Sequence, residues 1–262
     1  MTRATYFLAM AFALFAPQVK AEPPYEETHC LPHPYTAPSS APQVRLRDLM
    51  AALDLTVRGV PAMLHALDRQ KPVICIEPRP VLPRGFLDTG EMFIAVKSSL
   101  SFEEQRLIMI HELRHLEQFD RGHCPSTEIS MQENARAVMA TEADAMAITT
   151  LLAWDLKTIG HPGPWRVLNA WEQYGDIPRR FETELERAGD LETAVIAAFD
   201  QWYASAWRVN SYYIASCSDY LDRLDESHKL PSYGLLPDDY LTNLCRLPSG
   251  DPYACSDANR AK

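Results

Sequence analysis

Apolar residues in the first part of the chain follow two different periods. Between 45 and 67 they recur every three or four positions, which predicts helix, with Pro61 as a break or a fresh start. Short runs of β-branched and aromatic residues then occupy 73–76, 85–87 and 92–96 and predict strands, the last two joined by a turn. This part of the chain therefore predicts a small sheet.

After the strands, the apolar positions keep a helical period. Ser101 followed three residues later by Glu104 is a capping-box pattern, so a helix is expected over 102–119. A second helix, free of Pro and Gly and rich in Ala, is expected over 128–157, and three or four more over 164–223. Strands that precede helices in this way indicate an α+β fold, predominantly helical, rather than a wound parallel sheet.

The first 21 residues have the pattern of a secretory signal. A positively charged start precedes the apolar run 6–15, and Val19 and Ala21 are the small residues of a peptidase site. The run is shorter than the roughly 20 residues that span a bilayer, and no Cys precedes Cys30. We therefore expect cleavage after Ala21 and a periplasmic or secreted protein without a stable membrane anchor.

Composition narrows the class of protein further. The chain has 35 Asp and Glu against 25 Lys and Arg, a formal net charge of −10, so it lacks the cationic excess that binds nucleic acid. Its six cysteines include no C-x-x-C pair, which argues against a cysteine zinc cluster. An even number in an exported chain predicts three disulfides, whose connectivity the sequence leaves open.

The segment that carries chemistry is H-E-L-R-H at 111–115. His111 and His115 are four apart, so both lie on one helix face and their imidazoles can converge on one cation, for which Zn²⁺ is suited. Glu112 points to the side, from where its carboxylate could reach a metal-bound water but not the metal. That is the position of a general base for hydrolysis. A metal-free amphipathic helix is the alternative.

A catalytic zinc needs a third protein ligand. His123 is the first candidate, but Gln118 and Arg121 stand where the pattern H-E-x-x-H-x-x-G-x-x-H requires Gly and His. Glu142 shares its helix face with apolar residues, where a lone carboxylate is costly unless it is paired or ligates a metal. The favoured assignment makes Glu142 the third ligand and Asp144 the acceptor for a ligand imidazole N–H.

The depth of Glu142 in its helix complicates this assignment. In a simple helical hairpin, His115 lies about 9 Å from the end of its helix and Glu142 about 21 Å into the next one. Glu133 matches the depth better, although its neighbours indicate a solvated, salt-bridged position. Glu142 therefore requires a longer or crossed connection. Glu133 and Asp144 stay open as third ligands, and an ion pair with arginine stays open for Glu142.

The H-E-L-R-H motif with Gln118, followed by E-A-D-A at 142–145, resembles the zincin-type metallopeptidases of the gluzincin kind. It is similar to uncharacterised exported bacterial proteins described as metallopeptidases, over roughly 73–157. In gluzincins with an E-x-x-A-D pattern, the ligand precedes the Asp by four. That position is Ala140 here, so the third ligand departs from the pattern.

The resemblance implies a zinc-dependent peptidase with one Zn²⁺ per chain and a peptide or protein substrate. The implied ligands are His111, His115 and Glu142, with Glu112 as the base. In zincins, an edge strand before the active helix binds the substrate backbone, and 92–96 is the candidate here. A hydrogen-bond donor to the oxyanion is available downstream, but the sequence does not choose among Arg208, Tyr212, Tyr213 and His228.

The expected organisation has four parts. They are a signal peptide (1–21), a Pro-rich extended lead-in (22–43), a zincin-like metallopeptidase core (44–160) and a helical C-terminal part with a Cys-containing tail (161–262). The predicted function is that of an exported zinc hydrolase, in the first place a peptidase. The alternative is an exported binding or scaffold protein with a non-catalytic metal site or no metal. The oligomeric state stays open.

Overall fold

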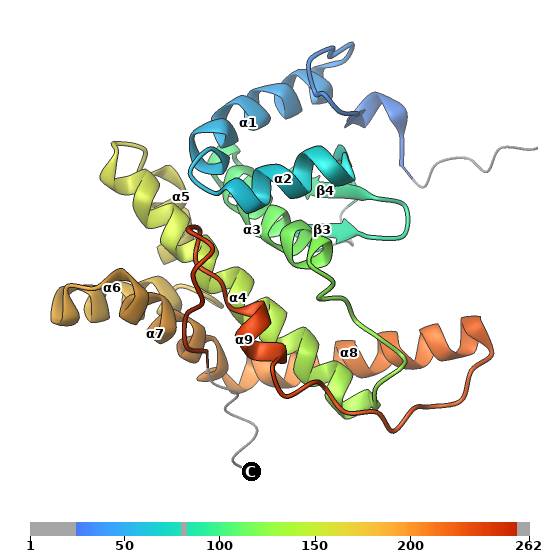
Figure 1. The fold of residues 1–262 in the computed structure, drawn as a ribbon. Helices are drawn as coiled ribbons and strands as arrows, with labels where there is room; N and C mark the ends of the chain where they lie inside the picture. The colour runs from blue at the N-terminus through green and yellow to red at the C-terminus, as the bar shows by residue number, and fades with distance from the viewer. Residues whose placement is uncertain (1–24, 80–82, 256–262) are drawn as a thin grey trace, which may run out of the picture.

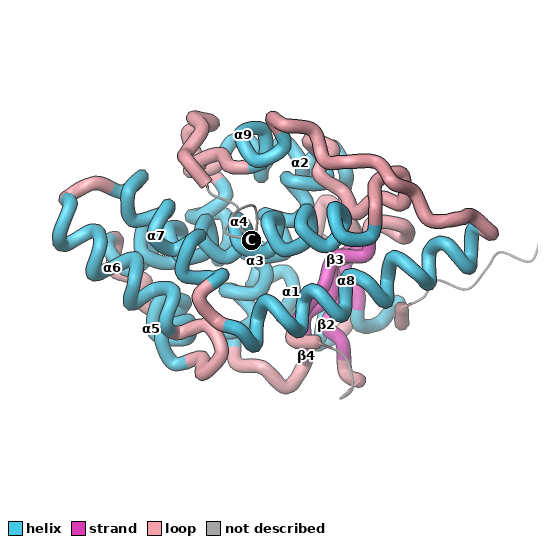
Figure 2. Tube along the Cα trace, turned by 90° about the horizontal axis from the view of Figure 1, so that it is seen from below, coloured by secondary structure: helices cyan, strands magenta, loops and turns pink. Residues whose placement is uncertain are grey.

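The computed structural model describes residues 25–79 and 83–255, so the expected signal peptide lies outside the described residues. Helices dominate, and one small sheet lies towards one side of the molecule (Figures 1 and 2). The strands are β1 Cys30–Leu31, β2 Val73–Glu77, β3 Gly85–Asp88 and β4 Phe93–Lys97. The helices are η1 Glu27–His29 (3-10), α1 Ala41–Val57, α2 Pro61–Gln70, α3 Phe102–Asp120, α4 Met131–Thr158, α5 Gly163–Ala170, α6 Asp176–Ala188, α7 Leu191–Tyr203, α8 Ala206–Ser227 and α9 Tyr240–Leu244. This agrees with the expected α+β class.

The sheet has the strand order β1-β2-β4-β3, with β2 and β4 parallel and both outer pairs antiparallel. All three expected strands are confirmed, and the Asp88 side chain closes the β3–β4 turn by accepting from the N–H groups of Gly90 and Glu91. The prediction that 92–96 lies at the sheet edge is wrong. β4 is hydrogen-bonded on both sides, because β2 takes the side opposite its hairpin partner. On this side of the sheet the edge strand is therefore β3, and β1 forms the opposite edge.

The lead-in is joined to the sheet by its cysteine. Cys30 forms a disulfide with Cys75, and β1 pairs with β2 at the same place. Sequence alone predicted three disulfides, and the described residues contain two, the second being Cys245–Cys255. Cys124 and Cys217 remain thiols. The residue of α8 that meets the segment around Cys124 is Arg223, which donates to the carbonyl of Pro125. Cys217 lies six residues before Arg223 and about 120° around the helix from it, so the two thiols are not brought together.

Helices α3 and α4 form the centre of the molecule (Figure 1). The expected capping box of Ser101 and Glu104 begins α3. One side of α3 packs against α1, α2 and the sheet, and the other against α4. The Ser130 hydroxyl caps α4, which therefore begins three residues later than expected. The ten residues 121–130 connect the two helices, which is longer than a simple hairpin turn.

The C-terminal half packs on the other side of α4. The expected three or four helices are four, α5 to α8, and α4 contacts all of them. Buried apolar side chains from Leu31 to Tyr253 form one continuous cluster through both halves. Over the described residues, no helix is both long enough and apolar enough to cross a bilayer.

Candidate metal centre

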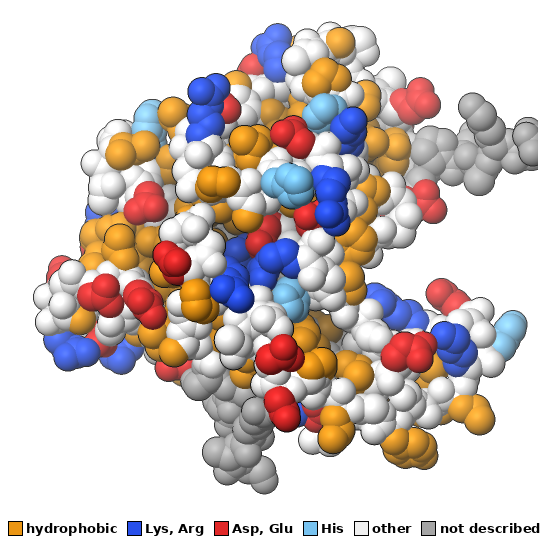
Figure 3. All heavy atoms as spheres, in the orientation of Figure 1, with side chains coloured by type: hydrophobic (Ala, Val, Ile, Leu, Met, Phe, Trp, Pro, Cys, Tyr) orange, Lys and Arg blue, Asp and Glu red, His pale blue; other side chains and the backbone are white. Residues whose placement is uncertain are grey.

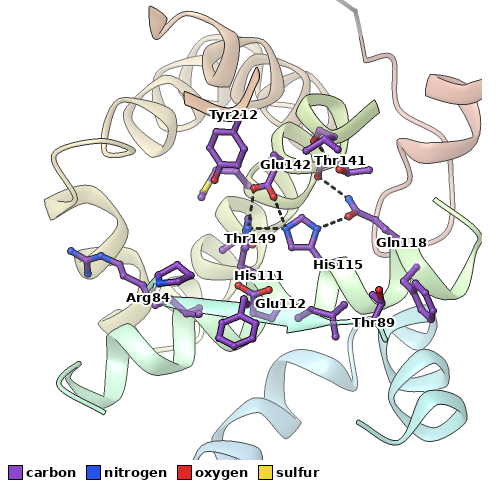
Figure 4. A pocket seen from close by; sticks show the side chains of 18 of the residues that line it. Arg84, Thr89, His111, Glu112, His115, Gln118, Thr141, Glu142, Thr149 and Tyr212 are labelled. Atoms are coloured by element: carbon purple, nitrogen blue, oxygen red, sulfur yellow. Dashed lines mark hydrogen bonds and ion pairs between the residues drawn. The ribbon is translucent and has the colours of Figure 1, made fainter. Parts of the chain in front are cut away.

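Three side chains predicted as ligands converge between α3 and α4 (Figure 4). The Nε2 atoms of His111 and His115 lie 3.0 Å apart. The Glu142 carboxylate faces both rings, with Oε2 3.6 Å from His111 Nε2 and Oε1 3.4 Å from His115 Nε2. The long connection between the helices lets α4 cross α3, so that Glu142, deep in α4, reaches the level of the histidines.

The ligand candidates line a pocket of about 440 Å³. Its walls come from β3, from α3 and the connection after it, from α4, and from Tyr212 and Arg223 of α8. In Figure 3 the molecule is hollowed between the part that carries the sheet and the arm formed by α8 and the chain after it. The side chains of the three donors are 16–19% exposed, so the pocket is a groove open to solvent rather than a closed cavity.

Glu112 lies against the sheet edge, on the pocket wall. It is 6% exposed, and the main-chain N–H of Leu87 in β3 donates to its carboxylate. This close approach requires Gly85, because a Cβ there would lie 2.3 Å from Ile108 Cγ2 and 3.4 Å from Glu112 Oε1. Burial raises the pKa of Glu112, against the opposing effect of the charges of His111 and His115. A buried carboxyl with a raised pKa is suited to accept and return a proton.

The electrostatics of the three-residue cluster couple its members. Burial acts to lower the pKa of His115, but the charge and hydrogen bond of Glu142 outweigh it and raise this pKa to about 9. Burial acts to raise the pKa of Glu142, and the two histidines outweigh it, so the pKa falls well below its usual value. The protein thus holds the Glu142 carboxylate against the His115 imidazole, whose charged form it favours, an arrangement in which a cation can replace the proton.

The donor set fits a zinc ion. Zn–N and Zn–O distances of about 2.0–2.1 Å in a tetrahedron place the donors about 3.3–3.4 Å apart. The three separations here are 3.0, 3.4 and 3.6 Å. The Gln118 side-chain carbonyl lies 2.8 Å from His115 Nδ1, which places the ring proton on Nδ1 and leaves the Nε2 lone pair for a metal.

The other predicted ligands lie elsewhere. Glu133 is at the start of α4, where it is buried, pairs with Arg136 and accepts from the N–H of Leu236. His123 lines the pocket, but its ring packs on Tyr240 rather than joining the cluster. Asp144 is fully buried and accepts from Gln118, so it is one hydrogen bond removed from the imidazole that it was predicted to bind directly.

The four candidate oxyanion donors are separated by the fold. Tyr212 lines the pocket, its hydroxyl bonds Glu142 and lies 3.1 Å from that of Tyr174, and burial together with the charge of Glu142 raises its pKa. Arg208 is buried in an ion pair with Asp176. Tyr213 and His228 are exposed. Only Tyr212 of these four is at the site.

Sequence reasoning missed the roles of several residues around the cluster. Arg114 and Asp144 form a buried two-pronged ion pair, with Nε–Oδ2 and NH2–Oδ1 distances of 2.8 and 3.0 Å. Tyr253, 109 residues later, donates to the same carboxylate at 2.7 Å. The signal for the first pair was present in the Arg of H-E-L-R-H and the Asp of E-A-D-A. No local pattern indicates Tyr253.

Comparisons with known proteins identify a family. No curated protein matches the chain. No solved structure matches it either. A family model matches residues 20–255, nearly the whole chain, and these residues include the cluster, Glu112 and both disulfides. The chain belongs to the family described as "Putative metallopeptidase family (DUF6782)".

Proposed function

We propose that this protein is an exported zinc-dependent peptidase of the zincin type, which holds one Zn²⁺ with His111, His115 and Glu142. The observation that carries the proposal is the convergence of these three donors in a groove, at separations suited to zinc, beside a buried carboxylate. Family membership supports the peptidase activity. The signal pattern at 1–21 and the two disulfides support export.

A Zn²⁺ ion held by this cluster would polarise the scissile carbonyl and lower the pKa of a coordinated water. Glu112 then acts as the base that removes a proton from the attacking water and later returns it to the leaving amine. The N–H of Leu87 holds the carboxylate in place, and burial raises its pKa towards the value such a transfer needs. Glu112 remains outside the ligand set because it points towards β3.

The substrate lies along β3 in this proposal. The strand is the sheet edge and contributes Gly85, Phe86 and Leu87 to the pocket wall next to Glu112. The Leu87 N–H is taken by Glu112, and an extended peptide can add to the remaining main-chain groups of this edge. Such hydrogen bonds position the peptide carbonyl without selecting a side chain. Tyr212 faces the groove from α8 and is the donor we propose for the oxyanion.

The test combines metal analysis with one substitution. The purified mature chain should contain about one zinc, and Glu112→Gln should retain the zinc while cleavage of a defined peptide library, followed by mass spectrometry, falls about 10²–10⁴-fold. Glu133→Gln is the matched control and should retain both properties. Negligible zinc in wild type, or full activity in Glu112→Gln, contradicts the proposal. Zinc without any cleavage favours a non-catalytic metal site.

A further inference from the structure

We propose that the C-terminal loop closed by the Cys245–Cys255 disulfide is a working part of the metal centre. In this proposal, Gln118 and Tyr253 are positioning residues, which act through a chain of buried hydrogen bonds to hold His115 in the orientation that binds the ion. The inference rests on the proposed function only in requiring that the cluster binds a metal.

The chain of hydrogen bonds begins at the ring of His115. Its Nδ1 lies 2.8 Å from Gln118 Oε1, one turn along α3, and this contact fixes both the tautomer and the plane of the ring. The Nδ1 of His111, by contrast, is buried without a hydrogen-bond partner among the described residues. His115 is therefore the imidazole whose orientation the surrounding protein sets.

Gln118 is itself held from α4. Its amide Nε2 donates to the Thr141 carbonyl at 3.0 Å and to Asp144 Oδ2 at 2.6 Å. Both acceptors flank Glu142 in the sequence, so one amide links the histidine on α3 to the segment that carries the carboxylate ligand. Gln118 is 1% exposed, so these hydrogen bonds are shielded from bulk solvent.

Asp144 is fixed in turn from two directions. Arg114 of α3 binds both of its oxygens, and the Tyr253 hydroxyl donates to Oδ1. The Arg114 guanidinium also pairs with Glu117 at 2.9 Å, so its charge is balanced by two carboxylates. These side chains are 0–3% exposed.

The C-terminal loop completes the arrangement from outside. Arg114 donates to the carbonyl of Arg246, and Arg121 donates to those of Asn243 and Leu244. Within the loop, the N–H of Tyr253 bonds the Cys245 carbonyl, and the Cys245–Cys255 disulfide closes the ring around it. The disulfide thus restricts the segment that presents the Tyr253 hydroxyl to Asp144.

A gain in stability alone does not explain why this buried chain of residues is polar. Taking several charges out of water is costly, and apolar residues could join α3 to α4 at least as well. The polar chain instead fixes the orientation of a side chain, because it ends on one ring nitrogen of the proposed ligand His115. Groups that bond the outer nitrogen of a metal-binding histidine typically change metal affinity about 10–100-fold when they are removed.

The experiment measures zinc affinity of the full mature chain by competition with a chromogenic chelator. Gln118→Leu should weaken binding about 10–100-fold, and Tyr253→Phe about fivefold, as expected for one hydrogen bond. The Cys245→Ser/Cys255→Ser double variant should weaken it in the same direction. The Co²⁺-loaded variants should show shifted visible absorption bands, which report ligand geometry around the ion directly.

Each variant has a matched control. Gln105→Leu alters a buried glutamine of the same helix that bonds the Lys97 carbonyl and Arg45, and Tyr220→Phe alters a buried tyrosine that bonds the Ile129 carbonyl. The Cys30→Ser/Cys75→Ser double variant opens the disulfide of the sheet. All three controls should bind zinc as wild type does, whatever their thermal stability.

The outcomes separate the two proposals. A wild-type chain that binds no zinc contradicts the proposed function. Zinc bound by wild type, and bound within twofold as tightly by Gln118→Leu and Tyr253→Phe, overturns only the inference drawn here. If Gln118→Leu fails to fold by circular dichroism, Tyr253→Phe decides, because it keeps the ring and removes one hydroxyl. Equal losses in variants and controls also overturn it.

Discussion

Two buried arginines, one in each half of the molecule, offer a comparison. Arg114 and Arg208 are each 1% exposed, and each binds both oxygens of an aspartate, Asp144 and Asp176 respectively. Each also donates to main-chain carbonyls, Arg114 to that of Arg246, and Arg208 to those of Gln173, Gln201 and Trp202. Both thereby join helices to irregular segments.

The hydrogen-bonded cluster around Arg114 and the one around Arg208 differ in where their hydrogen bonds lead. From Asp144 the bonds continue through Gln118 to the ring of His115. From Asp176 they continue to the Gln201 amide, and the residues bonded in the Arg208 cluster do not line the pocket. The lesson is that burial and pairing alone do not identify a functional ion pair. Under the proposed function, what identifies it is its connection to a metal ligand.

Replacing the two arginines is the strongest test of this comparison. Arg114→Met should lower the free energy of unfolding by about 3–5 kcal/mol, because it leaves the fully buried Asp144 carboxylate without its charged partner. Arg208→Met should lower it by less, because the Asp176 side chain is 34% exposed and solvent screens its charge. Urea unfolding measures this loss. Zinc affinity should fall only in Arg114→Met and stay within about twofold of wild type in Arg208→Met. A fall of similar size in both would remove the distinction.

Added zinc should stabilise the protein through the region of Arg114 and the candidate metal cluster, and not through the region of Arg208. Zinc at 100 times its dissociation constant should raise the free energy of unfolding by about 2.7 kcal/mol in wild type and in Asp176→Asn. The gain should vanish in His111→Ala, which lacks one of the three proposed ligands. Thermal unfolding with and without zinc measures it. A persistent gain in His111→Ala would indicate zinc binding at another site.

The pH dependence of the free energy of unfolding should show the contribution of the ion pair between Arg208 and Asp176. Burial acts to raise the pKa of Asp176, but hydrogen bonds from Arg208 and Gln201 and the Arg208 charge lower it overall. Because the pKa of Asp176 is lower in the folded state, its ionised carboxylate stabilises the fold in full above the pKa of the unfolded chain, about 3.9. This stabilisation is lost as the pH falls through the pKa of the folded state. The stability difference between wild type and Asp176→Asn should therefore shrink in acid. A pH-independent difference between pH 2 and 6 would contradict this assignment.

A partly exposed ion pair should contribute least to stability and so serves as a reference for the buried ones. Lys157 of α4 lies 2.7 Å from Glu182 of α6, and both side chains are about one-third exposed. Solvent weakens such pairs, so Glu182→Gln should change the free energy of unfolding by less than about 1 kcal/mol and leave zinc affinity unchanged. A loss as large as that of Arg208→Met would show that pairing matters more than burial in this protein.

Local patterns accounted for the elements of the fold. The capping box at Ser101 and Glu104, the turn after β3 and the break at Pro61 act over a few residues, and each is where the sequence indicated. Pairing between strands is not local. The hairpin of β3 and β4 gives no sign of which strand takes β2 on its other side, so the edge strand was assigned incorrectly.

The candidate site divides in the same way. His111, Glu112 and His115 follow from helical spacing, because residues four apart on a helix face one direction whatever surrounds them. Glu142 depended on how far α4 crosses α3, which the length of the connection permits but does not specify. Gly85 lies on a strand brought against α3, and its role follows only from that approach.

Interactions within one or two turns of chain were enough to predict most of the helices, three of the four described strands and the two imidazoles with their neighbouring acid. They did not predict η1, β1 or α9. Packing alone placed Gln118, not Asp144, against His115 and brought Tyr253, 109 residues after Asp144, into the same network. The physical reason is that a buried polar group must find its partner wherever packing brings one, and packing joins segments that have no fixed relation along the chain.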